Sequence, residues 1–247
     1  LSIPRDLWVD SLKTKINAVY HYGNLKGQDE GIKLTELAIL ETLGIPIHYT
    51  LVVNFDLFTK AIDLAGGVEV DVANAFTDYK FPIPGRENAE PPESRYETIS
   101  FTAGRQLMDG KKVLKFVRSR NASGDEGTDF ARSRRQHQVI SALRQKILST
   151  DFLLDKDNLE KLYQITEKNL ITNITPDLYP VLARLVLESR RYPVIDIPIS
   201  TETEGDNIAI LEHPPTKNYQ GQWVLIAKDN NWKALHRYLE NKLSGVQ

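Results

Sequence analysis

A repeated switch between two hydrophobic periods is the feature that most constrains the fold of this chain. Four consecutive segments alternate: a helix is predicted over residues 34–43, a strand over 48–55, a helix over 56–64 and a strand over 68–72. The helical segments carry apolar residues about every 3.6 positions, whereas the strand segments are rich in β-branched and aromatic residues. Gly44 ends the first helix, and Gly66 and Gly67 end the second. This alternation predicts a layered α/β domain.

The second half of the chain continues the same domain, without an internal repeat or a linker. Helices are predicted over residues 109–116, 129–149 and 159–169 and from Thr175–Pro176 and Trp232 onward, and strands over 194–199 and 223–227. A threonine followed by a proline is a typical helix start. At the other end, Leu1–Asp6 has the pattern of a strand that stops at Pro4 and enters a loop. We therefore predict a single domain over residues 1–247.

A proline-rich segment interrupts the alternation between Ala73 and Ser100. It contains Pro82, Pro84, Pro91 and Pro92. Because proline has no backbone donor and disrupts regular structure, we predict a long surface loop over residues 73–100. Such a loop is either a tolerated insertion or a functional segment, that is, a mobile lid or a partner-binding loop.

Composition excludes several classes of protein. The chain has 247 residues, 41% of them hydrophobic, and a formal net charge of −2, as in a folded globular protein. It has no cysteine, and its five histidines are far apart, so neither disulfides nor a thiolate or histidine metal site is expected. The small net charge argues against nonspecific nucleic-acid binding. No apolar run is long enough for a membrane span, and no glycine-rich nucleotide-binding motif is present.

Arginines concentrate between Val117 and Gln138, in the sequence VRSRNASGDEGTDFARSRRQHQ. Arg118 and Arg120 are two residues apart, so in an extended segment their side chains point the same way. Such a pair fits a clamp for phosphate oxygens, because a guanidinium group binds them with two parallel hydrogen bonds. It equally fits a favourable cluster of cations at the C-terminal end of a helix. The pair alone leaves both interpretations open.

The helix predicted over residues 129–149 favours an anion site. At about 100° per residue, Arg132, Arg135 and Gln136 fall on the same face as its apolar stripe, so two arginines point inward. Inward arginines require partners, because an unpaired buried charge costs several kcal/mol. One possible set of partners is a structural ion-pair network with Asp125, Glu126 and Asp129. The other is a multiply charged anion, most simply a diphosphate, and we favour the anion.

Two cations near the start of the chain are candidates for the same site. Arg5 follows the predicted strand end, and residues at strand ends commonly line pockets in α/β proteins. Lys15 begins the segment KINAVYHYG and is a further candidate.

Five segments of the chain resemble successive motifs of one bacterial family. They are LSIPRD, KINAVYHYG, LGIPIHYTLVVNFDLFTKAIDLAGGVEVDV, TAGRQLMDGKKVLKFVRSR and DFARSRRQHQVI, in that order between Leu1 and about Ser149. In sequence and in order they are similar to the motifs of the LytR-CpsA-Psr (LCP) family of cell-envelope proteins. The tail of the chain is compatible with the same family.

The resemblance implies a three-layer α/β/α fold with a central mixed sheet and a phosphotransferase activity. Family members transfer a glycopolymer, such as teichoic acid or capsule polysaccharide, from a polyprenyl diphosphate carrier to peptidoglycan, with assistance from Mg2+. They are anchored in the cell membrane by an N-terminal helix, and the catalytic domain is extracytoplasmic. The resemblance therefore implies cell-wall biogenesis, a polyprenyl diphosphate-linked glycan and peptidoglycan as partners, and no nucleic acid.

The resemblance also assigns roles to individual residues. The arginine of the family's PRD motif matches Arg5, those of its VRxR motif match Arg118 and Arg120, and those of its DFxRxxRQ motif match Arg132 and Arg135. These five are the expected catalytic residues. The expected substrate-binding residues are Gln136, which matches the last position of that motif, and Lys15, Asp6 and Asp129. Asp6 and Asp129 are also the candidates for the general base.

The family's metal-binding aspartates precede the PRD motif, in a segment that this sequence does not contain. We expect these ligands, the first strand of the sheet and the membrane anchor to lie upstream of Leu1, and we predict no metal ligand within the chain. Two alternative functions stay open. One is a hydrolase that cleaves polyprenyl diphosphate with water as acceptor, and the other is a noncatalytic module that binds polyprenyl phosphate or glycopolymer.

Overall fold

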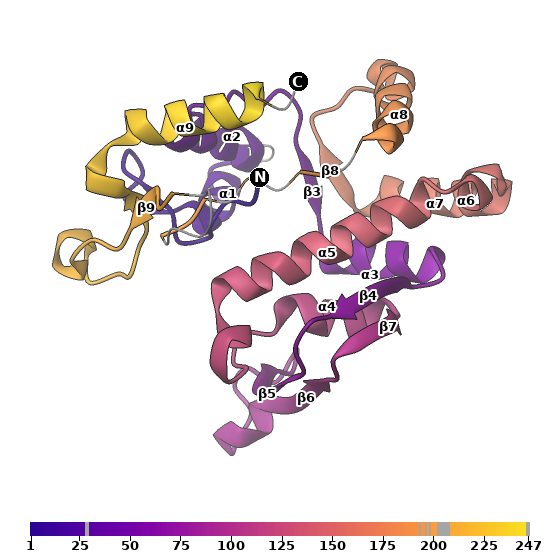
Figure 1. The fold of residues 1–247 in the computed structure, drawn as a ribbon, viewed down its shortest axis with the longest axis horizontal. Coiled ribbons are helices and arrows are strands. Elements are labelled where there is room, and N and C mark those ends of the chain that lie inside the picture. Colours follow the sequence, from indigo (N-terminus) through magenta and orange to yellow (C-terminus); the bar gives the residue numbers. More distant parts are fainter. Residues whose placement is uncertain (28–29, 193, 196, 198, 202–207, 246–247) are drawn as a thin grey trace. The chain divides into compact units, whose positions relative to one another are not determined.

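The chain forms two compact units (Figure 1). Each unit has its own hydrophobic core. The computed structural model describes residues 1–27, 30–192, 194–195, 197, 199–201 and 208–245, with the backbone alone at Asp129 and Phe130. The first unit comprises residues 1–50 and 194–247, and the second comprises residues 51–193. The single domain predicted over residues 1–247 stays a prediction. None of the helices in the described ranges is long and apolar enough to cross a membrane.

The first unit is built from both ends of the chain. Its elements are β1 (Trp8–Val9), β2 (Thr14–Lys15), α1 (Ile16–Asn24), α2 (Glu30–Leu43), β9 (Leu211–Glu212), η5 (Thr216–Tyr219), β10 (Ile226–Ala227), η6 (Lys228–Asn230) and α9 (Trp232–Ser244). Helices α1 and α2 approach closely at two glycines, since a Cβ added to Gly23 would lie 2.5 Å from the Cα of Gly31. Fully buried leucines, among them Leu7, Leu43 and Leu235, form the core of this unit.

The second unit contains the proline-rich and the arginine-rich segments. Its elements are β3 (Leu51–Val53), α3 (Phe55–Leu64), β4 (Val68–Val72), β5 (Phe76–Pro82), η1 (Pro92–Arg95), β6 (Tyr96–Phe101), β7 (Gly104–Met108), α4 (Gly110–Arg118), η2 (Gly124–Gly127), α5 (Asp129–Ile147), α6 (Thr150–Leu154), α7 (Lys156–Asn169), β8 (Leu170–Thr172), η3 (Pro176–Leu178), α8 (Tyr179–Glu188) and η4 (Ser189–Arg191). The side chains of Asn54, Asp109 and Thr128 each accept a hydrogen bond from a first-turn amide. These caps fix where α3, α4 and α5 begin.

The strands in the described ranges pair two by two, and every pair is antiparallel. The pairs are β1–β2, β3–β8, β4–β7, β5–β6 and β9–β10. The mixture of helices and strands confirms the predicted α/β class. The described strands do not join into the single central sheet of the predicted three-layer fold. Several of them are only two or three residues long, which leaves few ladder positions for a further strand.

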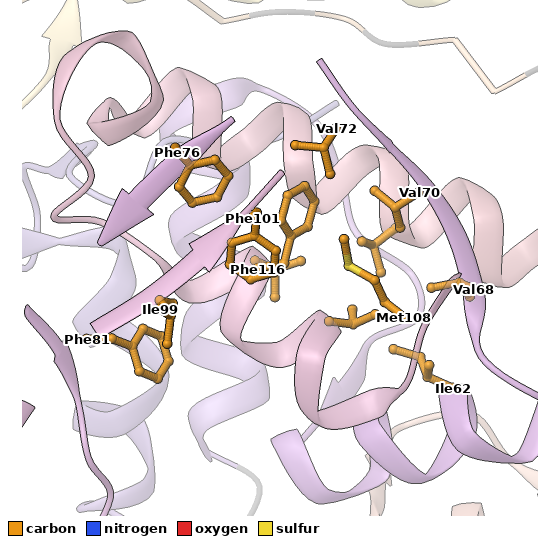
Figure 2. Packing of buried hydrophobic residues seen from close by; sticks show 13 residues of the cluster. Ile62, Val68, Val70, Val72, Phe76, Phe81, Ile99, Phe101, Met108 and Phe116 are labelled. Atoms are coloured by element: carbon orange, nitrogen blue, oxygen red, sulfur yellow. The ribbon is translucent and has the colours of Figure 1, made fainter. Parts of the chain in front are cut away.

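The core of the second unit draws side chains from several strands and from α4 (Figure 2). Phe76 of β5, Phe101 of β6 and Phe116 of α4 meet at its centre. The ring centroid of Phe101 lies 5.0 Å from that of Phe76 and 5.1 Å from that of Phe116. Aromatic pairs at these separations contribute packing energy beyond the area that they bury. This cluster therefore fixes the C-terminal half of α4, from which the first arginine pair emerges.

The irregular loop predicted over residues 73–100 is wrong for most of that segment. β5 and β6 form a hairpin in which Phe76 pairs with Phe101 and Pro82 pairs with Tyr96. Its inner face buries Phe76, Phe81, Ile99 and Phe101. The four prolines lie at the last position of β5 or in the connection to β6, where the ladder does not need their missing donors. In this segment the prolines therefore indicate the connection between β5 and β6, and the alternating aromatic residues indicate the strands themselves.

The predicted helices are confirmed with small shifts in their boundaries, whereas several predicted strands are wrong. β3 covers only residues 51–53, and both Leu51 and Val53 are more than half exposed, so the buried strand predicted over 48–55 is not formed. Leu1–Asp6 contains no strand. The strand predicted over 194–199 lies partly outside the described residues, and its described members belong to no strand. A short β-branched run becomes a strand only where a neighbour supplies the ladder, and sequence does not identify that neighbour.

We expect Phe116→Ala to lower the free energy of unfolding of the second unit by about 3–5 kcal/mol, because it leaves a cavity between two other phenylalanines. The control is Leu107→Ala on β7, whose side chain is 66% exposed. It should change the free energy of unfolding by less than about 0.5 kcal/mol. Urea denaturation followed by circular dichroism measures both variants. Equal losses would show that the aromatic cluster does not hold this unit together.

Candidate anion-binding site

The first arginine pair lies where α4 ends. Arg118 is the last residue of the helix, and Ser119 turns the backbone into an extended conformation with φ −56° and ψ 132°. The guanidinium carbon of Arg118 lies 4.6 Å from the ring centroid of Phe55 and 5.7 Å from that of Phe81. Arg118 is half-buried and Arg120 is exposed. The assumption that both arginines lie in one extended segment is therefore wrong for Arg118, because it still belongs to the helix.

Arg135 of α5 is buried against this turn instead of facing an open site. It is 4% exposed. Its Nε donates to Phe116 O at 3.1 Å, and its Nη2 donates to Ser119 O at 2.9 Å. Its Nη1 donates to Glu126 O at 3.0 Å and to Glu126 Oε2 at 2.7 Å. Of the two interpretations that the sequence left open for an inward arginine, the structural ion pair describes Arg135.

The electrostatics of Arg135 follow from this position. Burial lowers the pKa of its guanidinium, Glu126 acts in the opposite direction, and the nearby Arg132 and Arg134 lower it further. Its carbon also lies 4.8 Å from the ring centroid of Phe76. Four donated hydrogen bonds, one of them to a carboxylate, satisfy a group that would otherwise be costly to bury.

Gln136 binds the same turn, since its Nε2 donates to Val117 O at 3.4 Å. Together with the bonds from Arg135, this places donors on three carbonyl groups at the end of α4. Carbonyls at a helix end lack partners within the helix, and cationic donors there are favourable. The motif that contains Arg135 and Gln136 thus holds the backbone of the motif that contains Arg118 and Arg120.

Asp78, on β5, binds the turn from the other side and was not among the predicted site residues. It is fully buried. Its Oδ2 accepts hydrogen bonds from Ser119 Oγ at 2.8 Å and from the amides of Arg120 and Asn121 at 3.1 Å each. Its Oδ1 accepts one from the Lys80 amide at 2.9 Å. Burial acts to raise the pKa of this carboxyl, but the hydrogen bonds outweigh burial and the pKa is lowered.

A sequence signal for Asp78 exists. In FTDYKF the aspartate stands two positions after a buried phenylalanine, on the inward phase of a strand. Because an irregular loop is predicted over these residues, the inward-facing position of Asp78 is not recognised from the sequence. The remaining predicted members on α5 are Arg132, which is half-buried, and Asp129, whose side chain lies outside the described residues.

The other predicted residues cluster in the first unit. Asp6 is 7% exposed, and its Oδ1 accepts a hydrogen bond from Lys15 Nζ at 2.7 Å. Arg5 Nε lies 4.0 Å from Asp6 Oδ2. The same Nε is buried and has no hydrogen-bond partner among the described residues. Asp6 thus contacts both Arg5, a predicted catalytic residue, and Lys15, a predicted substrate-binding residue.

A cavity of about 500 Å3 opens beside this cluster. It is lined by Arg5, Leu12, Lys13, Thr14, Lys15, Asn17, Ala18, Tyr22, Gln220 and Gln222. Its wall therefore carries three cations and several neutral hydrogen-bonding side chains, a lining suited to an anionic, polar ligand. The predicted residues are brought together in two groups, one in each unit, and the prediction that Arg5 shares one site with the other arginines stays a prediction.

The Mg2+ that the family resemblance implies stays a prediction. Among the residues whose side chains the structure defines, no three histidines, aspartates or glutamates come together as metal ligands. Mg2+ normally takes a near-octahedral set of oxygen ligands, of which water and substrate phosphates often supply several.

We expect Arg135→Met to lower the free energy of unfolding by about 3–5 kcal/mol, because it removes the donors to Glu126 Oε2 and to three carbonyl groups. Arg120→Met is the matched control, since the Arg120 side chain is exposed and it should cost less than about 0.5 kcal/mol. Thermal unfolding of both variants measures the difference. A stable Arg135→Met protein would mean that the buried guanidinium does not hold the turn.

The lowered pKa of Asp78 predicts a pH dependence of stability. A carboxyl with a lowered pKa in the folded state contributes stability above its unfolded pKa, about 3.9. That contribution is lost as the pH falls through the folded-state value. The stability difference between wild type and Asp78→Asn, measured by urea denaturation, should therefore be largest near pH 7 and shrink below about pH 4. A difference that is constant down to pH 2 would contradict the assignment.

Known proteins resemble this chain along most of its length. The sequence profile of the LytR_cpsA_psr family matches residues 1–234. The chain is 34% identical over 183 residues to the polyisoprenyl-teichoic acid–peptidoglycan teichoic acid transferase TagV of Bacillus subtilis, covering 70% of this chain and 40% of that protein. It is 33% identical over 152 residues to TagU, of the same description, from Oceanobacillus iheyensis, covering 60% and 41%. The chain thus spans less than half the length of these relatives.

Solved structures show the same fold. The crystal structure of Bacillus subtilis TagV is similar with a TM-score of 0.61 and 25% identity, over 98% of this chain and 82% of that chain. An Enterococcus faecalis protein described as a transcriptional regulator is similar with a TM-score of 0.65 and 22% identity, over 98% and 76%. The profile match over nearly the whole sequence and the 34% identity to TagV lead to one assignment. The chain belongs to the LytR_cpsA_psr family.

Proposed function

We propose that this protein transfers a glycopolymer from a polyprenyl diphosphate carrier to a hydroxyl group of peptidoglycan. Membership of the family and the names of the relatives support the reaction class. TagV and TagU are named as teichoic acid transferases that act between a polyisoprenyl carrier and peptidoglycan. A structure similar in fold, with a TM-score of 0.59 and 20% identity, is described as TagT bound to LIIa-WTA.

The proposal is supported by a difference within the second unit between the backbone of the Arg118–Arg120 turn and the side chains of these two arginines. The backbone of the turn at Arg118–Arg120 is held on both sides by buried groups, Asp78 and Arg135. The guanidinium groups of Arg118 and Arg120 form no ion pair with a carboxylate in the described part of the chain. Two cations on a held backbone, with no carboxylate partner in that part of the chain, are suited to a ligand with several negative oxygens.

The proposed reaction breaks one phosphoanhydride bond and forms one phosphodiester bond. The acceptor oxygen of peptidoglycan attacks the phosphorus that carries the glycopolymer, and the bridging oxygen leaves with polyprenyl phosphate. The acceptor proton passes to a base, for which Asp6 and Asp129 stay the candidates. Arg118 and Arg120 would neutralise the oxygens that repel the acceptor and stabilise the charge that develops on the leaving phosphate.

The other predicted residues take two roles in this proposal. Arg5 and Lys15, held by Asp6 beside the cavity, would bind anionic oxygens of the substrate, as would Arg132. Arg135 and Gln136 would act as positioning residues, because their donors are used by the carbonyls of the Arg118 turn. Assistance by Mg2+ stays a prediction from the family resemblance.

The proposed substrates place the protein in the cell envelope. Polyprenyl carriers lie in the membrane and peptidoglycan lies outside it, so the transferase would work at the extracytoplasmic face. A membrane anchor that holds the domain there is part of the same proposal.

We expect Arg118→Ala and Arg120→Ala each to lower transfer by about 100-fold or more, because each removes charge stabilisation at the phosphate oxygens. The assay supplies glycan-labelled polyprenyl diphosphate substrate together with purified peptidoglycan and counts label in the insoluble fraction. Arg105→Ala is the control, since the Arg105 side chain on β7 is 80% exposed. It should retain wild-type transfer.

The same assay separates the alternatives. Label released as soluble glycan in the absence of peptidoglycan identifies a hydrolase. Label that stays on the carrier while the protein binds it identifies a noncatalytic binding module. Wild-type transfer by both Arg118→Ala and Arg120→Ala would reject the proposed role of the pair.

A further inference from the structure

A buried carboxylate that belongs to none of the predicted motifs lies next to the arginine pair. Asp78 is on β5, 41 residues before Ser119 along the chain, and it is fully buried. Both of its oxygens accept hydrogen bonds, as described above. The contact joins the hairpin β5–β6 to the end of α4.

The partners of Asp78 are unusual for a buried carboxylate. Its donors are three backbone amides and one hydroxyl group. In the described part of the chain no lysine or arginine side chain forms an ion pair with it. Four hydrogen bonds compensate for the burial of this charge, and three of them come from residues 119–121. The carboxylate is therefore bound to the turn after α4 and does more than fill the core.

The three donors to Oδ2 lie in the segment that carries the arginines. Ser119 separates Arg118 from Arg120, and the other two donors are the amides of Arg120 and Asn121. A single antiparallel bridge pairs Asp78 with Ala122, and Asn121 Nδ2 donates to Lys80 O at 3.0 Å. The segment after α4 thus runs along β5, and its path is set by the position of one carboxylate.

Asp78 and Arg135 act on opposite kinds of group in the same turn. The carboxylate takes the N–H and O–H donors of residues 119–121, while the guanidinium takes the carbonyls of Phe116 and Ser119. Removing either group would free the backbone on one side only. Groups that stabilise a transition state act best when the protein holds them in place beforehand.

We infer that Asp78 is a positioning residue for the reaction: by fixing the backbone of residues 119–121, it holds the guanidinium groups of Arg118 and Arg120 where they bind a diphosphate. This inference rests on the proposed function. It extends the site to β5 and to the hairpin, which the family motifs do not include.

We expect Asp78→Asn to weaken binding of inorganic pyrophosphate by about tenfold and to lower kcat/KM for glycan transfer by about 10–100-fold, because a small displacement of positioned groups is costly. Ser119→Ala removes one hydrogen bond and keeps the carboxylate, so it should show a smaller loss of the same kind. Calorimetric titration with pyrophosphate and the transfer assay measure these effects on folded protein. Asp71→Asn on β4, the same chemical change at an exposed position, is the control and should match wild type.

A purely structural role gives a different result. It predicts a lower unfolding temperature for Asp78→Asn with unchanged pyrophosphate affinity and unchanged kcat, and that result would overturn the inference. If Asp78→Asn does not fold, wild-type affinity and kcat in Ser119→Ala would overturn it as well. If wild type binds pyrophosphate but transfers no glycan, the proposed function fails, and the affinity of the variants still decides the role of Asp78.

Discussion

The buried guanidinium of Arg135 is the interaction on which the arginine-rich region depends. It lies on α5 and closes the end of α4 through the carbonyls of Phe116 and Ser119, and it reaches η2 through Glu126. A charge in this position is stable only because nearly every donor has a partner. The hydrogen bonds in turn fix how two helices and a short connection meet, so the site and the fold share one set of contacts.

This arrangement resolves a conflict in the local sequence. Three arginines stand in the first two turns of α5, where the helix dipole disfavours cations. In the fold, the guanidinium of Arg135 points toward the C-terminal end of α4, where carbonyl groups stabilise its positive charge. The motif residues therefore fall into two groups. Arg135 and Gln136 hold the turn through hydrogen bonds, and Arg118 and Arg120 extend their side chains from it. Arginines of two neighbouring motifs thus have different roles because their surroundings differ.

The first unit shows the same dependence on distant contacts. Leu225 N donates to Asp6 O at 2.9 Å, and Trp8 N donates to Leu225 O at the same distance. Residues from the far end of the sequence thus fix the segment that carries Arg5 and Asp6. The cavity beside it takes Gln220 and Gln222 from that same far end. Residues from both ends of the chain therefore determine which chemical groups line the cavity.

Sequence by itself determined the α/β class, the family, most of the helices and the residues that carry charge in the motifs, because hydrophobic period, caps and motif spacing are local properties. It placed Arg135 on the inward face of α5 and offered Glu126 as a partner, and both statements hold. Only the tertiary structure decided that the donors of Arg135 bind backbone carbonyls and Glu126, that Arg118 lies over the ring of Phe55, and that Asp78 binds the turn at residues 119–121. Residues 78 and 119 meet only after the hairpin and α4 pack around three phenylalanines, and no local pattern encodes which buried groups that packing brings together.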